Sequence, residues 1–206
     1  MARDAERLER ANEAPIVGGL PEVPGISVAM RLSPGLGVHL RGLADELLVN
    51  DFPGATISRA EREMLATATS AANDCFFCMD SHGAFATALL EKAGDTARLP
   101  AIETIKLGSS DGLDDKMQAL LHIARTVQRA PLDLTSADVD VATAAGASDA
   151  DVQLAVLIAS AFSMYNRMVD GLRARTAPDT EAYRGVAAEI AEYGYSNRPA
   201  AAPVQG

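Results

Sequence analysis

The sequence predicts an all-α protein, and three observations point to that fold class. The chain of 206 residues contains 39 alanines, and alanine has the highest helix propensity. Aromatic residues make up only 4% of the chain, so residue types that favour strands are scarce. Apolar residues recur at helical spacing, and no stretch alternates apolar and polar residues as a half-buried strand does. A chain of this length is expected to form one domain.

The formal net charge of -10 argues against two classes of partner. An excess of acidic groups repels the phosphates of nucleic acids and the headgroups of anionic lipids, so we expect neither nucleic acid nor membrane as a partner. The first residues are charged, and no apolar run approaches the roughly 20 residues that cross a bilayer. We therefore expect a cytoplasmic protein.

The chain is expected to begin with an irregular N-terminal arm over residues 1–32, where charged residues mix with glycine and proline. A single helical domain is expected over residues 33–195, followed by a flexible tail over residues 196–206. The first predicted helix begins at Ser33-Pro34, because serine is a good N-cap and proline suits the first helical position. Its leucines follow a helical period to about Asn50.

Two helices are predicted in the middle of the chain. Ser58 and Glu61 have the spacing of a capping box, in which both side chains accept backbone N–H groups, and this helix should run to about Ala72. Asn73-Asp74 then supplies a turn or an N-cap, and the next helix is predicted from Cys75 to Leu90. The later helices each follow Thr, Ser or Asp and end at Gly or Pro. They are predicted over residues 100–107, 113–129, 135–145, 148–173 and 180–193.

The chain has only two cysteines, Cys75 and Cys78, in a C-x-x-C pair. In a reducing cytosol such a pair is a redox or metal site more often than a structural disulfide. At 100° per residue, Cys75, Cys78 and His82 occupy one narrow face of a helix. The sequence therefore predicts that these three side chains act together.

The residues around the cysteines are suited to thiol chemistry. Cys75 would lie in the first turn of its helix, where unpaired N–H groups and the helix dipole lower the pKa of a thiol. His82 could pass a proton to or from Cys78. Glu63 stands on the preceding helix, and its carboxylate could orient the imidazole, as the third member of a catalytic triad does.

The pattern Glu-x11-Cys-x2-Cys-x3-His, with Ser-Ala-Ala-Asn before the first cysteine, resembles the AhpD-like alkylhydroperoxidases of the carboxymuconolactone decarboxylase family. The likeness is to the peroxidase-related branch of that family and extends over about residues 35–175. It includes the segment Tyr165-Asn-Arg-Met-Val-Asp-Gly-Leu172.

This resemblance implies an all-helical fold, assembly as a homo-oligomer (a trimer or a hexamer), and thiol peroxidase or disulfide reductase activity without a cofactor. It implies that Cys78 is the peroxidatic thiol, oxidised to a sulfenic acid by a hydroperoxide. Cys75, the more exposed partner, would then form the Cys75–Cys78 disulfide, which an external dithiol reduces. Glu63 and His82 would form the proton relay.

One position departs from the family pattern. The best-known AhpD peroxidases have a further histidine directly before the second cysteine, where this chain has Phe77. The loss removes one possible member of the relay. We expect Phe76, Phe77 and Phe85 to pack around the thiols.

Other interpretations remain open at this point. The two cysteines and His82 could ligate a structural metal, with His39 or Glu63 as the fourth ligand that such a site requires. A cofactor-free lyase of the carboxymuconolactone decarboxylase type is a further alternative. Glu63 could instead be a surface residue paired with Arg59 four residues earlier. Asn166-Arg167 could make a contact between helices or subunits.

Overall fold

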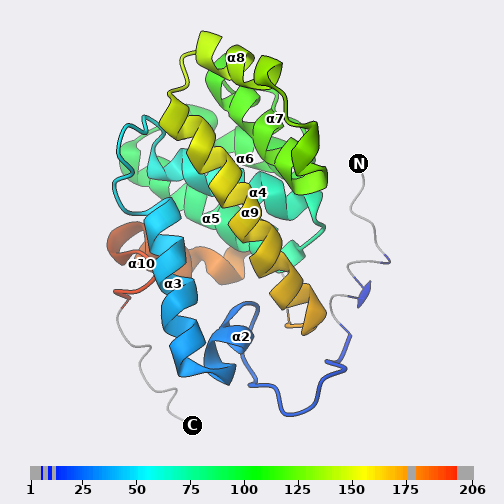
Figure 1. Ribbon diagram of the computed structural model, residues 1–206. Coiled ribbons are helices and arrows are strands. Elements are labelled where there is room, and N and C mark those ends of the chain that lie inside the picture. Colours follow the sequence, from blue (N-terminus) through cyan, green and yellow to red (C-terminus); the bar gives the residue numbers. More distant parts are fainter. Residues whose placement is uncertain (1–5, 7–8, 11–12, 176–179, 199–206) are drawn as a thin grey trace.

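The computed structural model describes residues 6, 9–10, 13–175 and 180–198 (Figure 1). Within these residues every regular element is an α-helix or a short 3-10 helix, and no strand is present. The predicted all-α class is therefore confirmed. The predicted tail falls largely outside the described residues, which end at Arg198.

The N-terminal arm contains a helix that the sequence analysis did not predict. Helix α2 (Ser27–Leu32) lies inside the segment expected to be irregular. It follows Gly25, whose φ of 55° is left-handed, and it buries Val28 and Ala29. Burial against the rest of the fold therefore stabilises a helix too short to be recognised from its own sequence.

Helix α3 (Pro34–Leu48) begins where predicted, because the backbone N–H of Leu36 donates to the Ser33 hydroxyl and proline occupies the first turn. It ends two residues earlier than expected. Helix α4 (Arg59–Ala72) has the predicted capping box: the Ser58 N–H donates to Glu61 Oε2 at 2.6 Å, and the Glu61 N–H donates to the Ser58 hydroxyl at 3.3 Å.

Helix α5 (Phe76–Ala93) follows α4 after a short turn and ends at Gly94, which has a left-handed φ of 72°. The remaining elements follow in chain order. They are η1 (Thr96–Arg98), α6 (Leu99–Lys106), α7 (Asp115–Arg129), η2 (Pro131–Asp133), α8 (Ser136–Ala144), α9 (Asp149–Gly171), η3 (Thr180–Tyr183) and α10 (Arg184–Tyr193).

Helix α4 is the central element of the fold. It packs against α5, α6, α7 and α9, and every residue from Ala60 to Ser70 is buried. Helix α9 crosses the front of the molecule in Figure 1, and α10 lies against α5. A polar side chain within this buried stretch is therefore surrounded by other helices, where it needs a hydrogen-bond partner.

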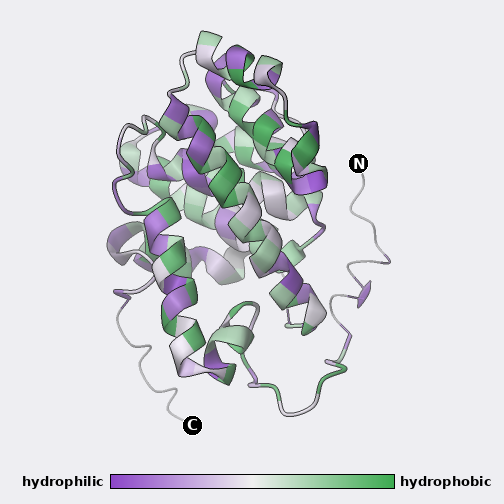
Figure 2. Cartoon of the chain, in the orientation of Figure 1, coloured by the Kyte–Doolittle hydropathy of each residue, from purple (hydrophilic) through white to green (hydrophobic). Residues whose placement is uncertain are grey.

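Helix α9 is long and apolar enough, by length and composition alone, to cross a membrane, a property that the sequence analysis did not expect. Half of its most apolar window is buried inside the fold, where it packs against α4 and α7. Figure 2 shows hydrophobic and hydrophilic residues mixed along α9. This is the pattern of a core helix with one buried side.

Candidate active site

The two cysteines lie at the start of α5 and are both free thiols. Cys75 is the N-cap residue, with an extended backbone, and Cys78 is the third residue of the helix. Cys75 is 0% exposed and Cys78 is 2% exposed. The expectation that Cys75 is the more exposed partner in the first helical turn is therefore wrong.

The pKa of Cys75 is raised, whereas the sequence analysis expected it to be lowered. A hydrogen bond between the two thiols is the main cause, and burial of Cys75 adds to it. The helix dipole does not lower the pKa of Cys75 as expected because Cys75 is the N-cap residue and precedes the first turn. The N-cap residue stands at the edge of the turn of free N–H groups, and Cys78 lies within that turn, where the dipole favours an anion. The raised pKa keeps Cys75 in its neutral thiol form.

A buried hydrogen-bond network fixes the turn that presents the thiols. Asp74 adopts a left-handed φ of 56°, and the Cys75 N–H donates to the Ser70 carbonyl at 3.0 Å. Asn166 on α9 donates from Nδ2 to the Ser70 hydroxyl at 3.1 Å, and its Oδ1 accepts from Asn73 Nδ2 at 2.8 Å. Asn166 therefore makes a contact between helices, which was one of the two roles considered for it.

The predicted partners Glu63 and His82 are in contact. Glu63 Oε2 lies 2.7 Å from His82 Nδ1, and Glu63 is 0% exposed on the central helix α4. The imidazole packs edge-on against Phe162, at 4.5 Å between ring centroids, and against Phe85, at 5.1 Å. Packing on both aromatic rings and a buried carboxylate hold the imidazole in one orientation.

The interpretation of Glu63 as a surface residue paired with Arg59 does not fit this structure. Glu63 is fully buried. The guanidinium of Arg59 donates instead to two carbonyl oxygens of α10, those of Ile190 at 2.8 Å and Ala191 at 3.0 Å. Arg59 therefore attaches the last helix to α4.

Tyr195 is a member of the site that the sequence analysis missed. Its hydroxyl donates to Glu63 Oε1 at 2.6 Å and lies 3.3 Å from His82 Nδ1. Tyr195 follows α10, in the part of the chain next to the predicted tail, so no helical period or motif spacing connects it with Glu63. The signal that could have indicated an ordered turn there is Gly194, which has a φ of 75°.

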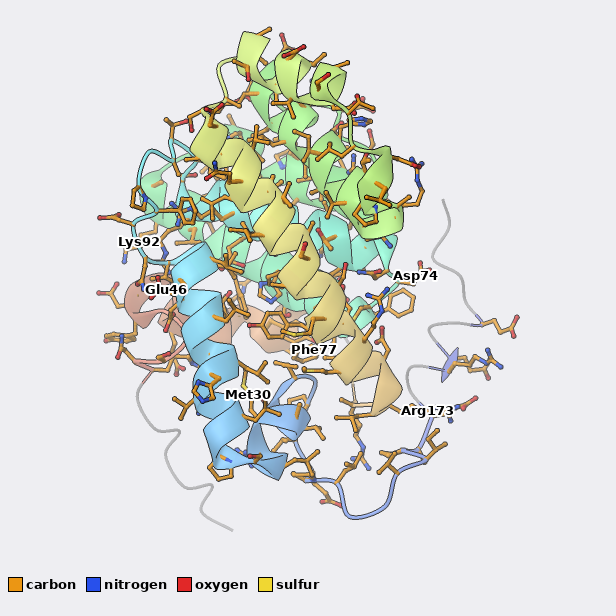
Figure 3. The ribbon with its side chains drawn as sticks, viewed as in Figure 1. Met30, Glu46, Asp74, Phe77, Lys92 and Arg173 are labelled. Atoms are coloured by element: carbon orange, nitrogen blue, oxygen red, sulfur yellow. The ribbon has the colours of Figure 1, made fainter. Side chains whose placement is uncertain are left out.

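Two of the phenylalanines pack around the thiols as predicted. Phe77 and Phe85 share a buried apolar cluster with both cysteines. Phe77 meets Tyr183 edge-on at 5.7 Å between ring centroids, and a side chain at Gly25 would overlap its ring. Figure 3 shows Phe77 near the lower end of α9, above α2. Phe76 is also buried, at 4% exposure. The position of the missing histidine is thus filled by apolar packing.

The described residues offer no set of ligands for the structural-metal alternative. Among them, no group of three or more His, Cys, Asp or Glu side chains is arranged to hold a metal ion. His39, considered as a fourth ligand, is exposed on α3.

Comparison with known proteins shows which family the segment around this site resembles. Residues 40–126 match the sequence profile of the carboxymuconolactone decarboxylase family, and this segment contains Glu63, both cysteines and His82. The resemblance stated from the sequence is confirmed. No curated protein matches the chain.

Solved structures with the same fold come from peroxidase-related proteins. The chain is similar to the alkylhydroperoxidase AhpD core of an uncharacterized peroxidase-related protein from Ralstonia eutropha JMP134, with 24% identity, a TM-score of 0.65, and coverage of 81% of this chain and 82% of that chain. It is also similar to an uncharacterized peroxidase-related protein from Silicibacter sp. TM1040, with 23% identity, a TM-score of 0.64, and coverage of 85% and 94%. At these identities the likeness establishes the AhpD-like fold and leaves the activity to be argued from the site.

Proposed function

We propose that the protein is a thiol-dependent hydroperoxidase or disulfide oxidoreductase that works through the Cys75–Cys78 pair. The observation that supports this proposal most directly is the contact between Glu63 and His82. His82 lies four residues after Cys78 on the same helix. An ionised carboxylate that accepts from Nδ1–H leaves Nε2 as the basic nitrogen of the ring. Such an imidazole can remove and return protons during thiol chemistry.

The first step oxidises Cys78. The Cys78 thiolate attacks one oxygen of a hydroperoxide ROOH, so that an S–O bond forms and the O–O bond breaks. The sulfur becomes a sulfenic acid, and the leaving RO⁻ takes a proton to become ROH. In this scheme His82 receives the thiol proton and returns it to the leaving oxygen.

The second step forms the disulfide. The Cys75 sulfur attacks the sulfenic acid sulfur of Cys78, losing its proton as the S–S bond forms, and the S–O bond breaks to release water. In support, Cys75 is the N-cap of α5 and Cys78 is the third residue of the same helix, so the two thiols are neighbours in its first turn. An external dithiol then reduces the Cys75–Cys78 disulfide by thiol exchange and is itself oxidised to a disulfide. The cytoplasmic location that we propose would supply such a dithiol.

We also propose that the chain works as a homo-oligomer, a trimer or a hexamer. In support, large apolar side chains on several helices are exposed in the single chain, among them Leu132 at 98%, Val141 at 62% and Leu157 at 44%. Association would remove these side chains from water. Light scattering of the purified protein tests this part of the proposal, and a monomer at micromolar concentration would contradict it.

The decisive experiment counts thiols before and after one equivalent of organic hydroperoxide. We expect two thiols per chain to be lost without a change in oligomer size, and Cys78→Ser to abolish peroxide consumption. Cys75→Ser should instead accumulate a sulfenic acid, detected by mass spectrometry as the gain of one oxygen atom. Unchanged peroxide consumption by Cys78→Ser, or by protein with both thiols alkylated, would contradict the proposal.

A further inference from the structure

The buried carboxylate of Glu63 has a donor on each of its oxygens. Oε2 faces His82 Nδ1 at 2.7 Å, and Oε1 accepts from the Tyr195 hydroxyl at 2.6 Å. An ionised carboxylate only accepts hydrogen bonds, so an ionised Glu63 requires a proton on His82 Nδ1 and one on the phenol oxygen. Both donors are needed, since a buried carboxylate with an unpaired oxygen is costly.

The backbone around Tyr195 is held as firmly as its hydroxyl. The N–H groups of Tyr195 and Ser196 donate to the two carboxylate oxygens of Asp45 on α3, at 2.6 Å and 2.9 Å. Asp45 is itself 8% exposed. Gly194 allows this arrangement because a Cβ at its position would lie 2.9 Å from Asp45 Oδ1. These hydrogen bonds fix the turn that positions the Tyr195 hydroxyl next to Glu63.

The ring of Tyr195 also belongs to the aromatic surroundings of His82. The two rings are nearly parallel, at 25° with 6.1 Å between centroids, and Phe85 meets Tyr195 at 6.1 Å and 67°. Burial and the neighbouring charge of Glu63 raise the pKa of Tyr195 well above its usual value. The phenol thus remains a donor to Glu63 over the whole physiological pH range.

We infer that Tyr195 is a positioning residue of the proton relay. Its hydroxyl donates a hydrogen bond to Oε1 of Glu63, so that Oε2 remains directed at His82 Nδ1–H. The other ring nitrogen, Nε2, is then free to take the proton of the thiol. Tyr195 acts through Glu63 and His82 and does not itself exchange protons with the substrate. This inference rests on the proposed thiol chemistry for its effect on rate. Its effect on the imidazole can be measured without turnover.

The test compares Tyr195→Phe with the matched control Tyr193→Phe. The first change removes the hydroxyl and keeps the ring, and the second removes an exposed hydroxyl two residues away, where the side chain is 48% exposed. ¹⁵N NMR of the histidine side chains reports the tautomer of each ring, and a His82→Asn protein assigns the signals of His82. Stopped-flow measurement of thiol oxidation by an organic hydroperoxide gives the rate.

We expect His82 of the wild-type protein to be the Nδ1–H tautomer, and Tyr195→Phe to produce a mixture of tautomers. Thiol oxidation should slow by about 10- to 100-fold, the usual effect of losing an outer-shell partner, while Tyr193→Phe matches the wild type in both measurements. A wild-type His82 in the Nε2–H tautomer would overturn the inference without any variant. So would a Tyr195→Phe protein that keeps the wild-type tautomer and rate. Wild-type thiols that resist peroxide would overturn the proposed function instead, and the NMR comparison would still decide the role of Tyr195.

Discussion

The Nδ1 atom of His82 lies 2.7 Å from Oε2 of Glu63, although the two residues come from different helices. Glu63 is fully buried on α4, the helix against which α5 packs. The contact therefore depends on the antiparallel return of the chain through the turn before Cys75. It also gives the imidazole a carboxyl partner that is shielded from solvent.

Glu63→Gln should slow peroxide-dependent thiol oxidation by roughly 10²- to 10⁴-fold, the range expected for the loss of general acid–base catalysis. The amide conserves the shape of the side chain but replaces the carboxylate beside His82 Nδ1 with a neutral group. Stopped-flow kinetics under excess hydroperoxide measure this rate. Glu46→Gln is the control, because Glu46 is exposed and accepts a hydrogen bond from Asn50 Nδ2. Equal rates for the two variants would remove Glu63 from the relay.

Asn166→Ala should lower the free energy of unfolding by about 1–3 kcal/mol, because the change removes the amide that donates to the buried Ser70 hydroxyl and accepts from Asn73 Nδ2. Asn166 is 1% exposed. Its neighbour Arg167 is exposed and donates to the Ser163 carbonyl on its own helix, so Arg167→Ala should change stability by less than about 0.5 kcal/mol. Urea unfolding followed by circular dichroism distinguishes the two. An Asn166→Ala protein with the stability of the wild type would show that the turn before Cys75 does not depend on this hydrogen-bond network.

Asp151 should make the fold sensitive to acid. Burial acts to raise its pKa, but hydrogen bonds from Thr56, Ser148 and Ile57 outweigh burial and lower the pKa to about 2. The Thr56 N–H and hydroxyl donate at 2.7 Å and 2.6 Å. The ordinary pKa of aspartate is about 3.9. Asp151 therefore contributes stability that is fully present above about pH 4 and is lost as the pH falls through about 2.

The contribution of Asp151 corresponds to about 2.5 kcal/mol, at 1.36 kcal/mol for each unit of pKa difference. The change Asp151→Asn should lower the free energy of unfolding at pH 7, and the difference from the wild type should shrink as the pH falls toward 2. Asp149→Asn, at an exposed first-turn position of the same helix, serves as the control. Urea titrations at a series of pH values measure both. A difference that stays constant with pH would contradict the assignment.

Gly194→Ala should displace the turn that carries Tyr195. The new methyl group would lie 2.9 Å from Asp45 Oδ1, and the backbone there has φ 75° and ψ -162°, a conformation that is essentially restricted to glycine and costs other residues roughly 1–3 kcal/mol. Gly185, in the first turn of α10, has open space where a Cβ would be. Gly185→Ala should therefore be neutral or stabilise the fold by up to about 1 kcal/mol. Thermal unfolding of both variants gives the comparison, and a stable Gly194→Ala protein would show that the turn has another conformation available.

Local sequence rules were sufficient for most of the helices. The capping boxes at Ser58 and Ser148 fix where α4 and α9 begin, and Gly94 ends α5, because each depends on residues within one turn of the helix. The burial of Cys75 could not be predicted in this way. It depends on an apolar cluster that α2 and α10 complete from distant parts of the chain.

The site was predicted to the extent that one short segment contains it. Glu63, the cysteines and His82 lie within 20 residues of sequence, and their spacing on two consecutive helices predicts that they meet. Tyr195 is separated from Glu63 by 132 residues, and no periodicity spans such a distance. Its contribution follows from tertiary packing alone.

The late position of Tyr195 has a consequence for how proteins with this motif are compared. The family profile ends at residue 126, so it contains the motif around the cysteines but neither Tyr195 nor the glycine that turns it inward. Two chains can therefore share the full cysteine motif while their carboxylates are held by different groups, or by solvent. Such chains could instead be grouped by the residue that donates to the glutamate oxygen facing away from the histidine, which is Tyr195 in this protein.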